Sequence, residues 1–242
     1  MPLPESCYLR IERAKEHANA LKFESEDFLS RSPFVTRDEI TTKEQVSIVE
    51  VRETPPPHLS VIAGDCIQSI RTSLDHLVWN LAGCPDPTTA RTNFPILQPP
   101  FIAKQTEQYL ASALAGIPDE ARALIESLQP DRGQEFWPRY NPLLLLAQLS
   151  NTDKHRSLVL TAASIEGATW NWFTDAEPAL GPVDDGDVLI RVPTGQPLHY
   201  RAKFGLAFAS DGPMKGMGVI NGTEMLIRAV EYEIFPRFEK FF

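Results

Sequence analysis

Arg71 and His76 are a permanent cation and an imidazole five residues apart, side chains that could bind an anion and exchange a proton. A guanidinium binds phosphate oxygens through two parallel hydrogen bonds. An imidazole exchanges a proton near neutral pH, so it can act as a general acid or base. On a regular helix these two side chains point about 140° apart. We therefore expect them to act on the same group only if the helix is irregular or a second subunit supplies one of them.

Further polar residues accompany this pair on two predicted helices, over 58–82 and over 142 to about 163. A polar stripe inside an apolar helix costs stability unless its members find partners, so we expect the two stripes to meet. The expected contact joins one of three residues on the first helix to one of three on the second: Arg71, Asp75 or His76 to Asn151, Asp153 or His155. The supporting set comprises Asp75, Asn80, Gln148, Asn151, Asp153, His155 and Arg156.

The same residues have a structural interpretation, which stays open beside the chemical one. Networks of Arg, Asp, His and Asn often fix the register of packed helices without any catalysis. On this interpretation the protein is a non-catalytic binding or interaction protein, and the residues Arg71, Asp75 and His76 and the segment Asn151–His155 only stabilise it. A third interpretation makes the segment 153–156 a solvated turn face.

The composition limits the class of protein. Of the 242 residues, 43% are hydrophobic and 23% are charged, which is typical of a soluble globular protein with a core. The net charge of −9 argues against bulk, sequence-independent binding of DNA or RNA, while a local basic site remains compatible with it. The sequence has no apolar run of the roughly 18 residues that a membrane span needs. Its start lacks the basic and apolar segments of a signal peptide.

The cysteines and histidines predict neither a disulfide framework nor a metal site. Cys7, Cys66 and Cys84 are odd in number and form no CxxC pair, so we expect free thiols in a cytoplasmic protein. His17, His76 and His155 lie on three different predicted helices. Their spacing matches no compact metal-ligand motif, and no carboxylate or cysteine accompanies them. We therefore expect no metal and no cofactor.

Apolar periodicity and turn residues indicate which elements position the polar side chains. Between 58 and 82 apolar residues recur every three or four positions, prolines 55–57 stop the preceding segment, and Gly83 ends the helix. β-branched residues dominate 34–53, which predicts a two-stranded hairpin. Asn141 followed by Pro142 is typical of a helix N-terminus.

The sequence as a whole predicts an α+β protein, with a helical bundle core and a small antiparallel β-sheet packed on one flank. We expect a single domain over 1–242, whose helical core covers about 8–30, 58–163 and 223–242 and whose β-rich portions cover about 34–54 and 167–220. Shorter helices are predicted over 102–115 and 119–128. Strands are predicted over 168–173, 187–192, 200–209 and 216–220. The last helix should be capped by Thr223 and kinked at Pro236.

Arg71 and His76, with Thr72 between them, form an Arg-x4-His motif that resembles the HEPN superfamily, small helical-bundle proteins of which many are metal-independent ribonucleases. The resemblance covers roughly 58–163. The second position of the family's motif is often Asn, Asp or His, so Thr72 departs from the pattern. The resemblance implies that Arg71 is the cation at the scissile phosphate of RNA. It also implies that His76 assists attack by the 2′-OH or protonates the leaving oxygen, in a cleft formed by a homodimer.

Overall fold

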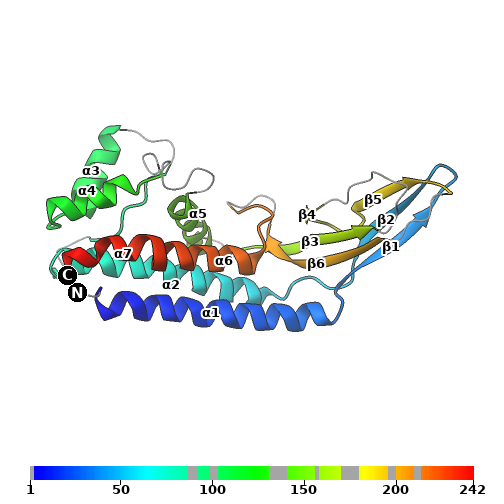
Figure 1. The fold of residues 1–242 in the computed structure, drawn as a ribbon, viewed down its shortest axis with the longest axis horizontal. Coiled ribbons are helices and arrows are strands. Elements are labelled where there is room, and N and C mark those ends of the chain that lie inside the picture. Colours follow the sequence, from blue (N-terminus) through cyan, green and yellow to red (C-terminus); the bar gives the residue numbers. More distant parts are fainter. Residues whose placement is uncertain are drawn as a thin grey trace. The chain divides into compact units, whose positions relative to one another are not determined.

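The computed structural model describes residues 3–86, 92–98, 103–130, 141–155, 158–169, 180–195, 200–209 and 214–242. Helices and small antiparallel sheets make up this part of the chain, which confirms the predicted α+β class (Figure 1). The chain divides into two compact units. The first is formed by Met1–Ala18, Gly64–Ser157 and Thr223–Phe242, and the second by Asn19–Ala63 and Leu158–Gly222. The expectation of one domain over 1–242 stays a prediction.

Two long helices, α1 (Glu5–Ser30) and α2 (Pro57–Leu81), run side by side (Figure 1) and confirm the helices predicted over 8–30 and 58–82. In the first unit the Cys66 thiol donates a 3.4 Å hydrogen bond to the carbonyl oxygen of Ala14, which ties α2 to α1. Most of the apolar residues that recur every three or four positions in each helix are buried. Apolar burial of this kind stabilises a helix more than its intrinsic propensity does.

The C-terminus of α2 has the geometry of a Schellman motif. Gly83 adopts a left-handed conformation with φ of 75° and Cys84 one of 55°. The N–H of Gly83 donates to the carbonyl of Asn80, and the N–H of Cys84 donates to the carbonyl of Trp79. These bonds satisfy carbonyls that the end of a helix leaves without partners, so Gly83 ends the helix as predicted.

The remaining helices are shorter. They are α3 (Ala103–Ala113), α4 (Asp119–Ser127), α5 (Pro142–His155), α6 (Val219–Arg228), a π-helix (Ala229–Ile234), α7 (Phe235–Phe238) and a 3-10 turn (Glu239–Phe241). α3 and α4 agree with the helices predicted over 102–115 and 119–128. Within the described ranges, no helix has the length and apolarity that crossing a membrane requires.

The second unit contains two three-stranded antiparallel sheets. The first has the order β1-β2-β5, from β1 (Phe34–Ile40), β2 (Glu44–Val51) and β5 (Val188–Pro193). The second has the order β4-β3-β6, from β4 (Gly181–Pro182), β3 (Leu160–Thr169) and β6 (Tyr200–Phe208). The predicted hairpin is confirmed, with Phe34 opposite Val51. The single small sheet that the sequence predicted is thus two sheets.

The predicted helix from 142 to about 163 is wrong in its last third. Its start is confirmed, because the Asn141 side chain caps the N–H of Leu144 at 3.1 Å and Pro142 is the first helical residue. α5 ends at His155, however, and β3 begins at Leu160. Leu158, Val159 and Leu160 form a short apolar run, which is compatible with either a helix or a strand. Pairing of Leu160 with Phe208 of β6 decides for a strand.

The C-terminal helix differs from the prediction at its start and in its middle. α6 begins at Val219, so Thr223 is a buried helical residue rather than a cap, and the strand predicted over 216–220 is reduced to one bridge from Gly218 to Ala207. A π-helix precedes Pro236, the residue at which the sequence predicts a kink, and the kink itself stays a prediction. Proline has no N–H to donate, and a π-type turn is one way in which a helix adjusts to a missing bond.

The strands predicted over 187–192 and 200–209 are confirmed as β5 and β6. Of the strand predicted over 168–173, residues 168 and 169 belong to β3, and 170–173 lie outside the described residues.

Candidate functional site

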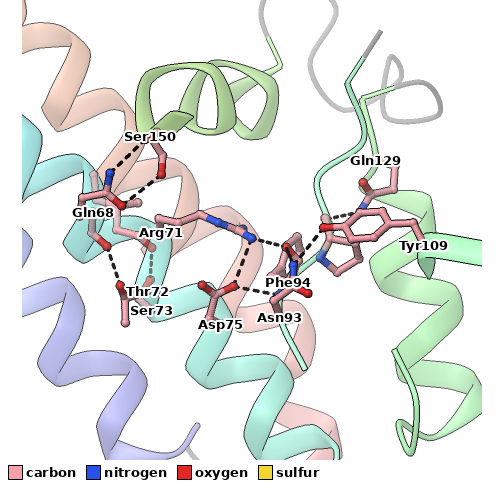
Figure 2. Close-up of polar contacts among 12 residues, drawn as sticks. Gln68, Arg71, Thr72, Ser73, Asp75, Asn93, Phe94, Tyr109, Gln129 and Ser150 are labelled. Atoms are coloured by element: carbon pink, nitrogen blue, oxygen red, sulfur yellow. Dashed lines mark hydrogen bonds and ion pairs between the residues drawn. The ribbon is translucent and has the colours of Figure 1, made fainter. Parts of the chain in front are cut away.

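Arg71 and Asp75 lie one turn apart on α2 and together bind the backbone of a single residue, Phe94. Arg71 Nη2 donates to the carbonyl oxygen of Phe94 at 2.6 Å, and Asp75 Oδ1 accepts from the N–H of Phe94 at 2.9 Å (Figure 2). The two side chains also form an ion pair, with 3.2 Å between Nη2 and Oδ1. We call Arg71, Asp75 and the Phe94 backbone the Phe94 clamp.

Burial governs the electrostatics of the Phe94 clamp. The Arg71 side chain is 13% exposed and the Asp75 side chain 33%. Desolvation raises the pKa of the Asp75 carboxyl, and this effect exceeds the lowering by Arg71, by the Phe94 N–H and by Lys154 and His76. Arg71 Nη1 is buried and has no hydrogen-bond partner among the described residues. The guanidinium therefore has one nitrogen bound to Phe94 and Asp75 and a second held away from water.

A buried glutamine fixes the same segment a few residues further along. Gln129, fully buried, accepts from the N–H of Leu97 at 2.9 Å and donates to the carbonyl oxygens of Pro95 at 2.9 Å and Ile125 at 3.0 Å. Its amide therefore satisfies three backbone groups. With the Phe94 clamp, it ties an extended segment without helix or strand to both α2 and α4.

The polar residues of α2 and α5 meet at Gln68. Gln68 Nε2 donates to the Ser150 carbonyl oxygen at 3.1 Å, and the Ser150 hydroxyl donates to Gln68 Oε1 at 3.1 Å (Figure 2). Gln68 Nε2 also donates to Asp153 Oδ2 at 3.1 Å. Asp153 lies against Gly64, where a Cβ atom would be 2.2 Å from Oδ1. Helix α5 thus contacts α2 where α2 has no side chain.

This arrangement corrects part of the expected contact between the two stripes. The stripes do meet, and Asp153 is one of the residues that join them, but its partner is Gln68 instead of Arg71, Asp75 or His76. The reason is that Arg71 and Asp75 bind Phe94, which approaches α2 from a segment that periodicity does not describe.

His76 lies apart from these bonds. Its Nδ1 atom is buried and has no hydrogen-bond partner in the described part of the chain. Desolvation lowers the pKa of the His76 imidazole most, and the positive charge of Arg10 lowers it further. The negative charge of Asp75 raises this pKa by a smaller amount. Neutral imidazole is therefore favoured near neutral pH. No hydrogen bond between described residues joins His76 to Arg71, in agreement with the 140° separation on a regular helix.

The other supporting residues have separate surroundings. Asn80 Nδ2 donates to the His76 carbonyl oxygen at 2.7 Å and contacts Ser6 Oγ at 3.4 Å, so it links α2 to the start of α1. Gln148 accepts from Thr152 through its backbone carbonyl, and Asn151 is exposed. The His155 side chain and all of Arg156 lie outside what the structure describes.

Sequence reasoning did not single out Gln68, Ser150 or Gln129. A signal for the first two existed: Gly64 interrupts an otherwise apolar helix, and a glycine inside a helix often marks the close approach of another element. Nothing comparable marks Gln129, whose partners are backbone groups of a loop. Among the described residues, no three His, Cys, Asp or Glu side chains lie close enough together to hold a metal ion.

Comparison with known proteins adds no functional assignment: the chain matches no protein-family model, no curated protein and no solved structure. The resemblance to the HEPN superfamily stays a prediction.

Proposed function

We propose that this chain is a non-catalytic binding protein in which Arg71 and Asp75 serve to hold the fold. The observation that supports this most strongly is the Phe94 clamp, where one side chain binds the carbonyl and the other the N–H of the same residue. To grip a phosphate with both its Nη atoms, Arg71 would have to give up its 2.6 Å hydrogen bond to the Phe94 carbonyl oxygen. A hydrogen bond from a charged donor contributes about 1.5–3 kcal/mol.

A cavity in the second unit supports the binding part of the proposal. It has a volume of about 320 Å³ and lies between α1, β6 and the start of α6. Apolar cavities of this size, with a few polar groups on the wall, are typical of small-molecule sites.

The competing proposal is a metal-independent endoribonuclease or an RNA-binding relative that uses Arg71 and His76 in a homodimer. The observation in its favour is His76, whose unpartnered Nδ1 and lowered pKa leave the imidazole able to accept a proton near neutral pH. The net charge of −9 counts against it, because RNA would have to approach a negative molecule.

Cleavage and stability assays on the full chain separate the two proposals. We expect no cleavage of a fluorescent single-stranded RNA by the parent protein. We expect Arg71→Ala to lower the free energy of unfolding by about 2 kcal/mol, since it removes hydrogen bonds from a charged donor. The matched control is Arg13→Ala, which removes an exposed arginine of α1 and should change stability by less than about 0.5 kcal/mol. RNA cleavage by the parent that His76→Ala abolishes without loss of stability would overturn the proposal.

A further inference from the structure

The strand β1 forms one edge of its sheet, because among the described strands it is hydrogen-bonded to β2 alone, in the order β1-β2-β5. At its start β1 lies against β6, where the ring centroids of Phe34 and Phe204 are 6.0 Å apart. Further along, the four residues from Arg37 to Ile40 are all exposed. The large apolar side chain of Ile40 is 68% exposed. The outer edge of β1 is therefore accessible over its last four residues.

The hydrogen bonds at the two ends of the hairpin show which backbone groups of β1 point toward β2. Antiparallel strands alternate between residue pairs that exchange hydrogen bonds and pairs that do not. The N–H of Thr41 donates to the carbonyl oxygen of Glu44, and the N–H of Arg52 donates to that of Pro33, both at 2.8 Å. In the register of this hairpin the odd-numbered residues of β1 therefore bond to β2.

The even-numbered residues of β1 direct their backbone groups away from β2. In the described part of the chain, no hydrogen bond reaches the backbone N–H or C=O of Thr36, Asp38 or Ile40. Groups of this kind, repeated every second residue, match the repeat of another extended strand. The accessible edge of β1 can therefore pair with a further strand, as unprotected sheet edges do.

The charges on β1 are complementary to a second copy of β1 in one antiparallel register. If Asp38 lies opposite Asp38 of the second copy, two-fold symmetry places Arg37 opposite Glu39 twice. Arg37 and Glu39 then form non-hydrogen-bonded pairs, in which the side chains of the two strands are closest. The two Asp38 residues form a hydrogen-bonded pair, whose side chains are further apart. Opposite charges across two strands stabilise their pairing, so this register is favourable.

The neighbouring registers are unfavourable. A shift by two residues is the smallest one that keeps the outward-directed backbone groups opposite each other. In one direction it places Arg37 opposite Arg37 of the second copy, and in the other it places Glu39 opposite Glu39. Like charges directly opposite each other are destabilising. Within one chain Arg37 Nη2 lies 2.9 Å from Glu39 Oε1, so in the favourable register the four charges alternate in sign around the two-fold axis.

We propose that two copies of this chain pair through β1 across a two-fold axis, so that their sheets of order β1-β2-β5 join into one sheet of six strands. The backbone groups of Thr36, Asp38 and Ile40 hold the two strands together, and Arg37 and Glu39 select the register. Ile40 then lies opposite Thr36 of the second copy, a pair of β-branched residues of the kind that favours strand pairing.

The interface is small, because only the accessible part of one strand contributes to it. Interfaces below about 1,200 Å² are typical of weak, transient complexes, so we expect a reversible dimer. The inference goes beyond the proposed binding function. It does not depend on the Phe94 clamp, whose residues belong to the first unit, while β1 and β2 belong to the second.

Sedimentation velocity of the full chain over a range of concentrations measures the dissociation constant of the dimer. We expect the parent to form a dimer whose fraction rises with concentration. Arg37→Glu turns two attractive pairs in the dimer into two repulsive ones and should weaken dimerisation about tenfold, and Glu39→Arg should do the same. Asp38→Asn removes the like-charge pair at the two-fold axis and should strengthen dimerisation about threefold.

An equimolar mixture of the Arg37→Glu and Glu39→Arg variants separates pairing between chains from damage within one chain. In a mixed dimer every acidic side chain at these positions faces a basic one, so the mixture should regain the dimer that each variant alone loses. The matched control is Arg13→Glu, which makes the same change of charge at an exposed position of α1. This control variant should dimerise like the parent.

Three results would each show that the inference is wrong. The first is a parent protein that stays monomeric at every concentration. The second is a dimer that Arg37→Glu leaves unchanged, since such a dimer forms through another surface. The third is a mixture of the two variants that remains as monomeric as each variant alone. Stability of the Arg71→Ala variant reports on the Phe94 clamp, so its result is independent of these outcomes.

Discussion

Asp153 places its carboxylate in the space that Gly64 leaves open, so that a Cβ atom at position 64 would lie 2.2 Å from Oδ1. The other carboxylate oxygen of Asp153 accepts a 3.1 Å hydrogen bond from Gln68, one turn further along α2. The absence of a side chain at position 64 is therefore a condition for the bond that joins α5 to α2. Glycine in a helix interior is otherwise unfavourable by about 1 kcal/mol relative to alanine.

We expect Gly64→Ala to destabilise the protein by about 1 kcal/mol, although alanine is the better helix former. The methyl group displaces the Asp153 carboxylate and breaks its bond with Gln68, a loss of about 1.5–3 kcal/mol, against a gain of about 1 kcal/mol in helix propensity. Urea denaturation measures the difference. In an Asp153→Ala background the clash is gone, so the same change should become stabilising. Additive effects of the two substitutions would contradict the proposed relationship.

Gln129→Ala should lower the free energy of unfolding by about 2 kcal/mol or more. The substitution leaves the N–H of Leu97 and the carbonyl of Pro95 without their partner, and both residues are buried. Thermal and urea denaturation measure the effect. Gln105→Ala, at an exposed position of α3, is the control and should stay within about 0.5 kcal/mol of the parent. Equal stability of the two variants would show that Gln129 does not hold the segment.

The lowered pKa of His76 predicts a pH dependence of stability. Between its folded pKa and the unfolded value near 6.5, the unfolded chain binds more protons at this site than the folded chain does. The contribution of His76 to stability is therefore present above pH 6.5 and is lost as the pH falls through this window. His76→Gln should flatten the slope of stability against pH there. The ¹H resonance of the His76 imidazole should titrate below 6.5, and a midpoint above 6.5 would reverse the predicted sign.

The three thiols should differ in reactivity. Burial raises the pKa of Cys66 to about 12 and that of Cys7 to about 11, although a hydrogen bond with Ser6 opposes the shift at Cys7. Cys84 is exposed. Because only the thiolate is nucleophilic, a thiol reagent at pH 8 should label one cysteine in the native protein and three after unfolding. Cys84→Ser should remove the rapid phase, and rapid labelling of Cys66 in the folded state would contradict this description of the core.

Local patterns in the sequence determined the elements whose stability depends on local features. The apolar repeat of α2, its start after three prolines and its Schellman end at Gly83 all involve residues close together along the chain, and so does the hairpin of β1 and β2. The ion pair of Arg71 with Asp75 is also local, since a separation of four residues on a helix brings side chains together in any fold.

Tertiary structure decided the rest, because the partners come from distant segments. The apolar run at Leu158 is compatible with a helix until β6 supplies hydrogen bonds from about fifty residues later. Arg71 and Asp75 bind the backbone N–H and C=O of Phe94. Nearly every residue carries these same two groups, so a pattern of side chains in the sequence does not predict this contact. The cavity arises where α1, β6 and α6 come together in space. The spacing of residues along the sequence indicates which residues share one face of a helix. The residues that this face contacts are determined by the tertiary packing.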